Sequence, residues 1–147
     1  MTAIAIANRF LSIEQMSHLR VQRLSYIAYG RYMAVTGKSL CDEKPISFES
    51  GPGFLTIYRA LSSYGHLPIK KPIEDEFGEV EMLGYRCPVV NEIISEVMEL
   101  YGNMDPDHLA QVCCLNDGAW YNARQKTPFG MLAIMGDSEI VSHFRMH

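Results

Sequence analysis

Apolar residues recur every three or four positions along several stretches of the chain, and the clearest stretch lies between residues 18 and 36. This spacing places side chains on one face of an α-helix. The apolar positions of the stretch are Val21, Leu24, Ala28, Tyr32 and Val35. Gly37 follows at the place of a left-handed C-terminal cap. The pattern therefore predicts a helix that ends at Gly37, with Arg20 and Arg23 on its solvent side.

Further helices are predicted by the same periodicity and by capping residues at their ends. Ser12, with Gln15 three positions later, fits a capping box. Asp105 followed by Pro106 fits the start of a helix. The additional helices are expected over residues 2–11, 54–64, 88–101, 106–113 and 138–144. The sequence thus predicts a mainly α (α+β) fold of about five or six helices with a small β-hairpin.

Two short segments are typical of extended structure. One is Ile46–Glu49, which leads into the turn signal Ser50–Gly53. In the other, Val80, Met82 and Tyr85 lie near a period of two, so we expect a short strand that pairs with the first segment. Carboxylates surround this second segment, and a charged edge that blocks unwanted pairing is favoured over an acidic docking surface for a basic partner. They are Glu74, Asp75, Glu76, Glu79 and Glu81.

Composition and charge narrow the class of protein. The chain has 147 residues, of which 48% are hydrophobic and 20% are charged, and this profile predicts one globular domain over residues 1–147. The net charge of −4 disfavours nucleic-acid binding, because that binding depends on neutralising phosphates. We expect neither a membrane span nor a secretory signal. The four cysteines show no C-x-x-C spacing, which favours reduced thiols in a cytoplasmic protein.

No cluster of residues predicts catalysis or metal binding. His143 and His147 are four positions apart, but they lie at the end of the chain and no further ligand accompanies them. Cys87 lies beside an arginine and has no recognisable base, so it is a poor nucleophile. The segment Ser50–Gly53 precedes a helix, where anions bind, yet Pro52 lacks an N–H donor, and a structural turn is favoured. We therefore expect no catalytic residue, no metal and no cofactor.

Aromatic residues near the end of the chain are candidates for a partner-binding surface. Trp120 is the only tryptophan and follows a predicted turn at Asn116–Gly118. Tyr121 is its neighbour and Arg124 lies one helical turn later. Trp, Tyr and Arg dominate the hot spots of protein interfaces. The alternative is that Trp120 is an anchor of the core, and the sequence leaves both interpretations open.

Several tyrosines are also candidates for partner binding. Tyr29 falls on the less apolar side of its predicted helix, so we expect it to be exposed. Tyr26 and Tyr58 fit either a binding face or the wet rim of a core. If Tyr29 contacts a partner, its replacement by Ala weakens binding and changes the melting temperature little.

Three groups of residues occur in an order that is known from one family. They comprise Gln22, Leu24, Tyr26 and Gly30 in the first helix, then Gly51-Pro52 with Tyr58-Arg-Ala-Leu61 and Tyr64-Gly65, then Asp117-Gly-Ala-Trp120 with Ala123-Arg124. Over residues 5–144 this order resembles the Panacea-domain antitoxins, the phage-associated SocA-like family. The chain departs from the family pattern at a few positions. Arg31 stands where a tryptophan is common, Gly53 replaces a valine, and Cys114-Leu115 replace a Thr-His pair.

The resemblance implies a small cytoplasmic antitoxin, often prophage-encoded, that binds and neutralises a growth-inhibiting toxin encoded by the adjacent gene. An adaptor that delivers the toxin to a protease, or a small ligand-binding or regulatory phage protein, is the alternative. A deep pocket around Ser50–Phe54 with Tyr26 or Trp120 would favour ligand binding. Homodimer formation is left open. The candidate partner-binding residues are Tyr26, Tyr29, Arg31, Tyr58, Trp120, Tyr121 and Arg124.

Overall fold

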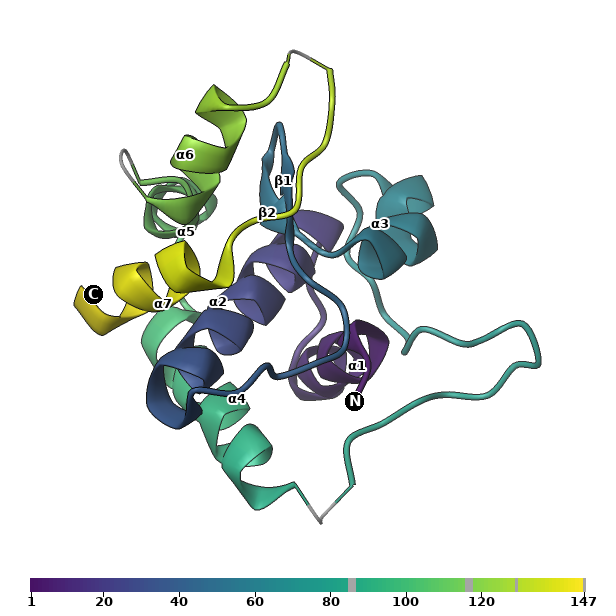
Figure 1. Ribbon diagram of the computed structural model, residues 1–147. Coiled ribbons are helices and arrows are strands. Elements are labelled where there is room, and N and C mark those ends of the chain that lie inside the picture. The colour runs from purple at the N-terminus through teal and green to yellow at the C-terminus, as the bar shows by residue number, and fades with distance from the viewer. Residues whose placement is uncertain (85–86, 116–117, 129, 147) are drawn as a thin grey trace.

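Helix α2 (His18–Thr36) runs through the middle of the protein, and most other elements pack against it (Figure 1). The computed structural model describes residues 1–84, 87–115, 118–128 and 130–146. Within these ranges the other helices are α1 (Ala3–Ile13), α3 (Leu55–Leu61), α4 (Pro88–Tyr101), α5 (Pro106–Cys113), α6 (Ala119–Gln125) and α7 (Asp137–Met146), with a 3-10 turn at Ser62–Tyr64. Helix makes up 56% of the structure. The predicted mainly α fold with a small hairpin is confirmed.

Local side-chain chemistry fixes both ends of α2. The Ser17 hydroxyl accepts a hydrogen bond from the backbone N–H of Arg20 (3.3 Å) and caps the N-terminus. Gly37 ends the helix with a φ of 73°, as the sequence predicts. The capping box predicted at Ser12 and Gln15 is wrong, because Ser12 lies inside the last turn of α1. None of the described helices, α2 included, is both long and apolar enough to cross a bilayer.

The burial of side chains along α2 differs from the simple stripe that the periodicity predicts. Val35 belongs to the predicted stripe but is 71% exposed, because the neighbouring elements leave the C-terminal end of α2 open. Arg20 and Arg23 were assigned to solvent and are instead half-buried. Arg20 donates a hydrogen bond from Nη1 to the carbonyl oxygen of Met104 (3.0 Å). This correction follows from the packing of α5 and the hairpin on that side of α2.

The hairpin consists of β1 (Ile46–Phe48) and β2 (Gly51–Gly53), which pair in antiparallel register with Ser47 opposite Pro52. Ser50–Gly53 was predicted as a turn, but only Glu49 and Ser50 form the turn and the remaining residues form β2. A Cβ atom on Gly53 would lie 2.7 Å from Oε1 of Gln22, so only glycine lets this strand approach α2 so closely.

The strand predicted around Val80 and Met82 is also wrong. Val80 forms a single isolated bridge with Glu74, no described residue of this segment belongs to a strand, and Tyr85 lies outside the described residues. The second neighbour of β1 is Ile134, far along the chain, which bridges Ile46. Because there is no sheet edge at residues 74–82, the interpretation of the carboxylates there as edge protection is wrong as well.

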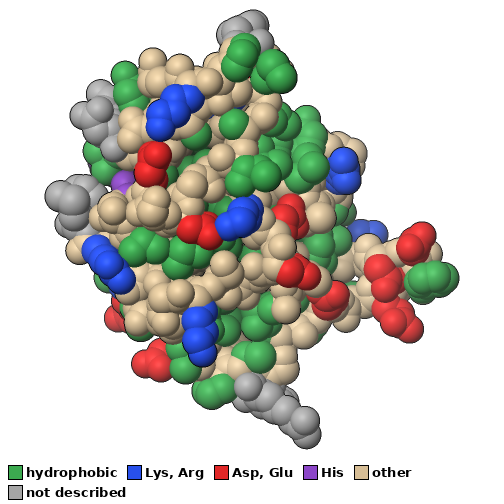
Figure 2. Space-filling model, viewed as in Figure 1, with side chains coloured by type: hydrophobic (Ala, Val, Ile, Leu, Met, Phe, Trp, Pro, Cys, Tyr) green, Lys and Arg blue, Asp and Glu red, His purple; other side chains and the backbone are tan. Residues whose placement is uncertain are grey.

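Residues 74–82 form an acidic arm that stands away from the helices (Figures 1 and 2). A buried asparagine, Asn8, anchors the base of the arm. Its Nδ2 donates to the carbonyl oxygens of Ile73 (3.1 Å) and Glu81 (2.9 Å), and its Oδ1 accepts from the N–H of Ile73 (2.7 Å). Phe77 lies on the arm with 82% of its surface exposed. The arm is therefore tied to α1 at its base and open to solvent beyond it.

Candidate partner-binding face and neighbouring cleft

The hairpin has one buried face and one open face. Strand β1 is flanked on its second side by residues 133–135, since the Ser47 N–H donates to the Ala133 carbonyl (2.9 Å) and the Met135 N–H donates to the Pro45 carbonyl (3.0 Å). Side chains alternate between the two faces of a strand. Ser47 is fully buried, whereas its neighbours on β1 are partly open.

Large apolar side chains gather on the open face. Ile134 is 65% exposed, Met131 58% and Leu132 49%, and all three lie within four residues of one another. Tyr58 of α3 is 45% exposed and stacks on Phe48, with ring centroids 5.2 Å apart. Figure 2 shows hydrophobic side chains over the hairpin, its flanking segment and α3. We term this surface the apolar face, and it comprises Ile46, Phe48, Tyr58, Met131, Leu132 and Ile134.

Two of the predicted contact residues form hydrogen bonds to the backbone of the segments that carry the apolar face. Trp120 donates a hydrogen bond from Nε1 to the carbonyl oxygen of Phe48 (2.7 Å). Arg124 donates from Nη1 to the carbonyl oxygens of Ser47 (2.9 Å) and Met131 (2.8 Å). Helix α6 therefore braces both β1 and the segment beside it. Of the turn predicted before α6, residues 116 and 117 lie outside the described residues.

Tyr26 and Tyr29 are core residues, which corrects their prediction as partner contacts. Tyr26 is 1% exposed and Tyr29 is fully buried. The Tyr29 hydroxyl donates to a carboxylate oxygen of Asp137 (2.9 Å), and burial raises the pKa of this tyrosine. Burial likewise raises the pKa of Tyr26. The expected exposure of Tyr29 is wrong because α7 covers the less apolar side of α2.

The remaining predicted residues differ in how open they are. Arg31 is half-buried and forms an ion pair with Glu96 of α4. Tyr121 is half-buried on α6, and Tyr58 is the most open of the predicted set. The structure therefore brings Tyr58 into the apolar face, supports that face with Trp120 and Arg124, and places Arg31 elsewhere. Sequence reasoning missed residues 131–134, whose only signal is a run of four apolar residues, Met-Leu-Ala-Ile.

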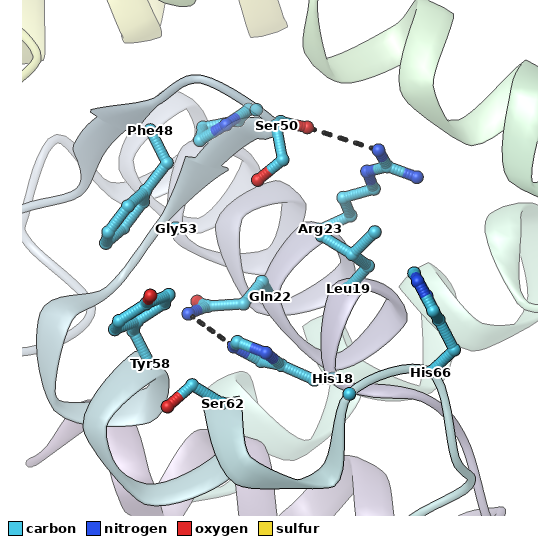
Figure 3. A pocket seen from close by; sticks show the side chains of 13 residues that line it. His18, Leu19, Gln22, Arg23, Phe48, Ser50, Gly53, Tyr58, Ser62 and His66 are labelled. Atoms are coloured by element: carbon cyan, nitrogen blue, oxygen red, sulfur yellow. Dashed lines mark hydrogen bonds between the residues drawn. The ribbon is translucent and has the colours of Figure 1, made fainter. Parts of the chain in front are cut away.

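A cleft of about 260 Å³ lies beside the apolar face, between α2, the hairpin and α3 (Figure 3). On its α2 side, His18 and Gln22 form a side-chain hydrogen bond, with 3.2 Å between His18 Nε2 and Gln22 Nε2. The His18 ring lies 5.7 Å from that of Tyr58, and burial lowers the pKa of this histidine. Tyr26 and Trp120 are not among the lining residues. This cleft is therefore not the pocket lined by Tyr26 or Trp120 that would have favoured ligand binding through those two residues.

The N-terminus of α3 is occupied by the protein's own polar groups. The Thr56 N–H donates to a carboxylate oxygen of Glu43 (3.1 Å), and the Phe54 N–H donates to Oε1 of Gln22 (2.7 Å). A helix N-terminus attracts negative charge, and here Glu43 supplies it. Glu43 and Gln22 therefore occupy the N–H groups of Thr56 and Phe54 at this helix end.

Nucleophilic chemistry is disfavoured at the buried cysteines. Burial raises the pKa of Cys41 to about 11 and raises the pKa of Cys113 further. The thiolate is the reactive form of cysteine, so these thiols are inert near neutral pH. Within the described ranges no three His, Cys, Asp or Glu residues are grouped to hold a metal ion, and His147 lies outside those ranges.

Comparison with known proteins finds no matching family model, no matching curated protein and no matching solved structure. The case for a function therefore rests on the chain's own residues and geometry.

Proposed function

We propose that this protein is a cytoplasmic antitoxin that neutralises a cognate growth-inhibiting toxin by binding it directly through the apolar face. The observation that carries the proposal is the exposure of Ile134, which bridges Ile46, and of Tyr58, which stacks on Phe48, together with the exposure of Met131 and Leu132 on the segment of Ile134. Contiguous apolar surface on a protein marks sites of protein contact. The hydrogen bonds from Trp120 and Arg124 keep this surface in one arrangement, which lowers the entropic cost of binding.

The arrangement of the resemblance motifs supports the same proposal. Gln22, from the first motif, bonds to Phe54 beside β2, which carries the second motif. Trp120 and Arg124, from the third motif, bond to β1. Motifs that are far apart in the sequence thus meet in one structural unit around the hairpin. This convergence supports the resemblance, because residues that define a shared fold are expected to meet within it.

Binding alone is sufficient for the proposed activity. A standard protein interface buries about 1,200–2,000 Å² in total, and a few central apolar and aromatic residues supply most of its free energy. A toxin is neutralised when such an interface covers its active surface or its route to the target. The proposal therefore requires no catalytic group on this chain.

Co-expression with the product of the adjacent gene tests the proposal. The neighbour alone should stop growth, and the wild-type protein should restore it. Ile134→Asp places a charge on the apolar face and should abolish rescue, whereas Val35→Asp should retain it. Val35 is a matched control, because it is an equally apolar and similarly exposed residue at the far end of α2. The proposal fails if the neighbour is harmless alone, or if both variants rescue equally.

The acidic arm favours one alternative function, that of an adaptor which delivers the toxin to a protease. An adaptor holds two proteins at once and so needs two separate surfaces. Phe77 is 82% exposed on an arm that carries several carboxylates, and the arm is anchored through Asn8 on α1, away from the hairpin. If the adaptor alternative holds, Phe77→Ser stabilises the toxin in a pulse-chase measurement without weakening its binding. An unchanged toxin half-life would favour simple blocking.

A further inference from the structure

The cleft between α2, the hairpin and α3 carries positive charge that no lining carboxylate offsets. Arg23 supplies this charge, and the lining includes no aspartate or glutamate from the described ranges. His18 and His66 also line the cleft, and burial lowers the pKa of His18, which favours its neutral form. The protein as a whole has a net charge of −4, so a cleft of this composition departs from the rest of its surface. Such a lining favours a negatively charged guest.

Arg23 is held in place without a carboxylate partner among the described residues. Its terminal nitrogens donate to the carbonyl oxygens of Ser50 (3.2 Å) and Pro106 (3.4 Å), and its Nε is buried with no hydrogen-bond partner. Carbonyl oxygens orient a guanidinium group but leave its charge unneutralised. A fixed guanidinium is well suited to recognise a phosphate or a carboxylate.

Hydroxyl groups add neutral donors to the same cleft. Ser50, Ser62 and Tyr58 all line it, and Figure 3 shows their side chains around its opening. None of these three hydroxyls has a hydrogen-bond partner in the part of the chain that the structure describes. They are free to donate to the oxygen atoms of a guest.

The far side of the cleft is aromatic. Phe48 and Tyr58 stack on each other with an angle of 20° between their rings. Figure 3 places this pair on one side of the cleft and Arg23 with His66 on the other. A planar ring in the cleft can contact this pair edge to face, an arrangement that is favourable between aromatic groups. The volume of about 260 Å³ lies just below the range typical of small-molecule pockets, which suits a guest of one or two rings.

We propose that this cleft binds a small molecule that joins an oxyanion, either phosphate or carboxylate, to a flat ring. The oxyanion lies at Arg23 and His66 and accepts a hydrogen bond from the Ser50 hydroxyl, and the ring lies against Tyr58, beside the Ser62 hydroxyl. This site adjoins the apolar face and shares Phe48 and Tyr58 with it, but its test needs neither a toxin nor growth.

Calorimetric titration of the purified protein at low ionic strength tests the proposal with four probes. Adenosine 5′-monophosphate and indole-3-acetate carry both features, as a phosphate and as a carboxylate. Adenosine lacks the anion and inorganic phosphate lacks the ring. We call the first two compounds the two-part probes and the last two the one-part probes. We expect at least one two-part probe to bind more than tenfold more tightly than each one-part probe. The identity of that probe distinguishes a phosphate guest from a carboxylate guest.

Variants of the chain show whether the cleft is the site of binding. Arg23→Gln should weaken the tighter probe about tenfold or more, since it removes a charge-assisted contact, and Arg23→Lys should recover part of the loss. Arg20→Gln is the matched control, because Arg20 lies on the same helix and also bonds to a backbone carbonyl but does not line the cleft. Ser62→Ala should weaken the same probe by about threefold to tenfold and holds no contact of the fold.

The proposal is overturned if neither two-part probe binds more tightly than the one-part probes. It is also overturned if Arg23→Gln and Arg20→Gln weaken binding equally. If Arg23→Gln does not fold, Ser62→Ala and His66→Gln replace it, because both residues are exposed. Unchanged binding of the probe by these two variants overturns the proposal, and weakened binding supports it.

Discussion

The side-chain amide of Gln22 satisfies both backbone polar groups of Phe54. Its Oε1 accepts from the Phe54 N–H (2.7 Å) and its Nε2 donates to the Phe54 carbonyl oxygen (3.0 Å). Both residues are buried, so water has little access to these groups. One glutamine thereby joins α2 to the junction of β2 and α3, and it positions both the hairpin and Tyr58.

Replacement of Gln22 by Leu should destabilise the protein by about 1–3 kcal/mol. The leucine fills a similar volume but leaves the buried N–H of Phe54 without a partner, whereas the Phe54 carbonyl oxygen keeps its hydrogen bond from the Tyr58 N–H (3.0 Å). Urea denaturation followed by circular dichroism measures the change. Gln15→Leu, at an exposed position, is the control and should change stability little. A loss below about 0.5 kcal/mol for Gln22→Leu would mean that water replaces the amide.

Gly30→Ala should destabilise the protein through a clash with a single ring. A Cβ at this position would lie 2.1 Å from two carbon atoms of Phe144, far inside van der Waals contact. Overpacking of this kind costs about 1–3 kcal/mol. The double variant Gly30→Ala with Phe144→Leu should cost less than the sum of the two single changes, because the ring that clashes is gone. Gly136→Ala, with nothing within 4 Å of its Cβ, is the control. If the costs of the two single changes add up in the double variant, the clash with Phe144 is not the source of the destabilisation.

Tyr29 and Tyr58 should respond to truncation in opposite ways. Tyr29→Ala removes a fully buried ring and its hydrogen bond to Asp137, and should cost about 3–5 kcal/mol. Tyr58→Ala removes a ring that is 45% exposed, and should cost less than about 1.5 kcal/mol while weakening toxin binding about tenfold or more. Thermal melts and a binding titration separate the two effects. Equal losses of stability would remove Tyr58 from the proposed contact surface.

Local signals in the sequence predicted most of the helices, although α6 was not among those expected. The stripe and Gly37 defined α2, and Asp105 caps α5 through a hydrogen bond from the His108 N–H (2.9 Å), as the Asp-Pro pair predicts. These features depend on residues within a few positions of one another. They can therefore be predicted from the sequence of each helical segment alone, without knowledge of the fold.

Features that depend on distant segments were not predictable in the same way. The partner of β1 on its open side is Ile134, and no local pattern links it to Ile46. Tyr29 was expected to be exposed because its own helix is mixed in polarity there, and only the docking of α7 buries it. The apolar face and the cleft both arise from such tertiary contacts. The sequence marks Trp120 as a candidate residue, but its hydrogen bond to the Phe48 carbonyl oxygen becomes evident only from the fold.

Acidification should weaken the fold through His18. Its pKa is lowered by burial in the folded state, so the unfolded chain takes up this proton more readily. Stability rises with pH wherever the unfolded state binds more protons. The contribution of His18 is therefore fully present above about pH 6.5, declines as the pH falls below that value, and levels off below the folded pKa.

The measurement is the free energy of unfolding between pH 5 and pH 8 for the wild type and for His18→Gln. Glutamine keeps a hydrogen-bonding group near Gln22 and removes the titration. The difference between the two curves should narrow by about 1.4 kcal/mol for each unit by which the pKa of His18 is lowered. A nuclear magnetic resonance titration of the His18 ring supplies that pKa directly. Parallel curves would show that His18 titrates alike in both states, and that its burial beside Tyr58 leaves the charged form accessible to water.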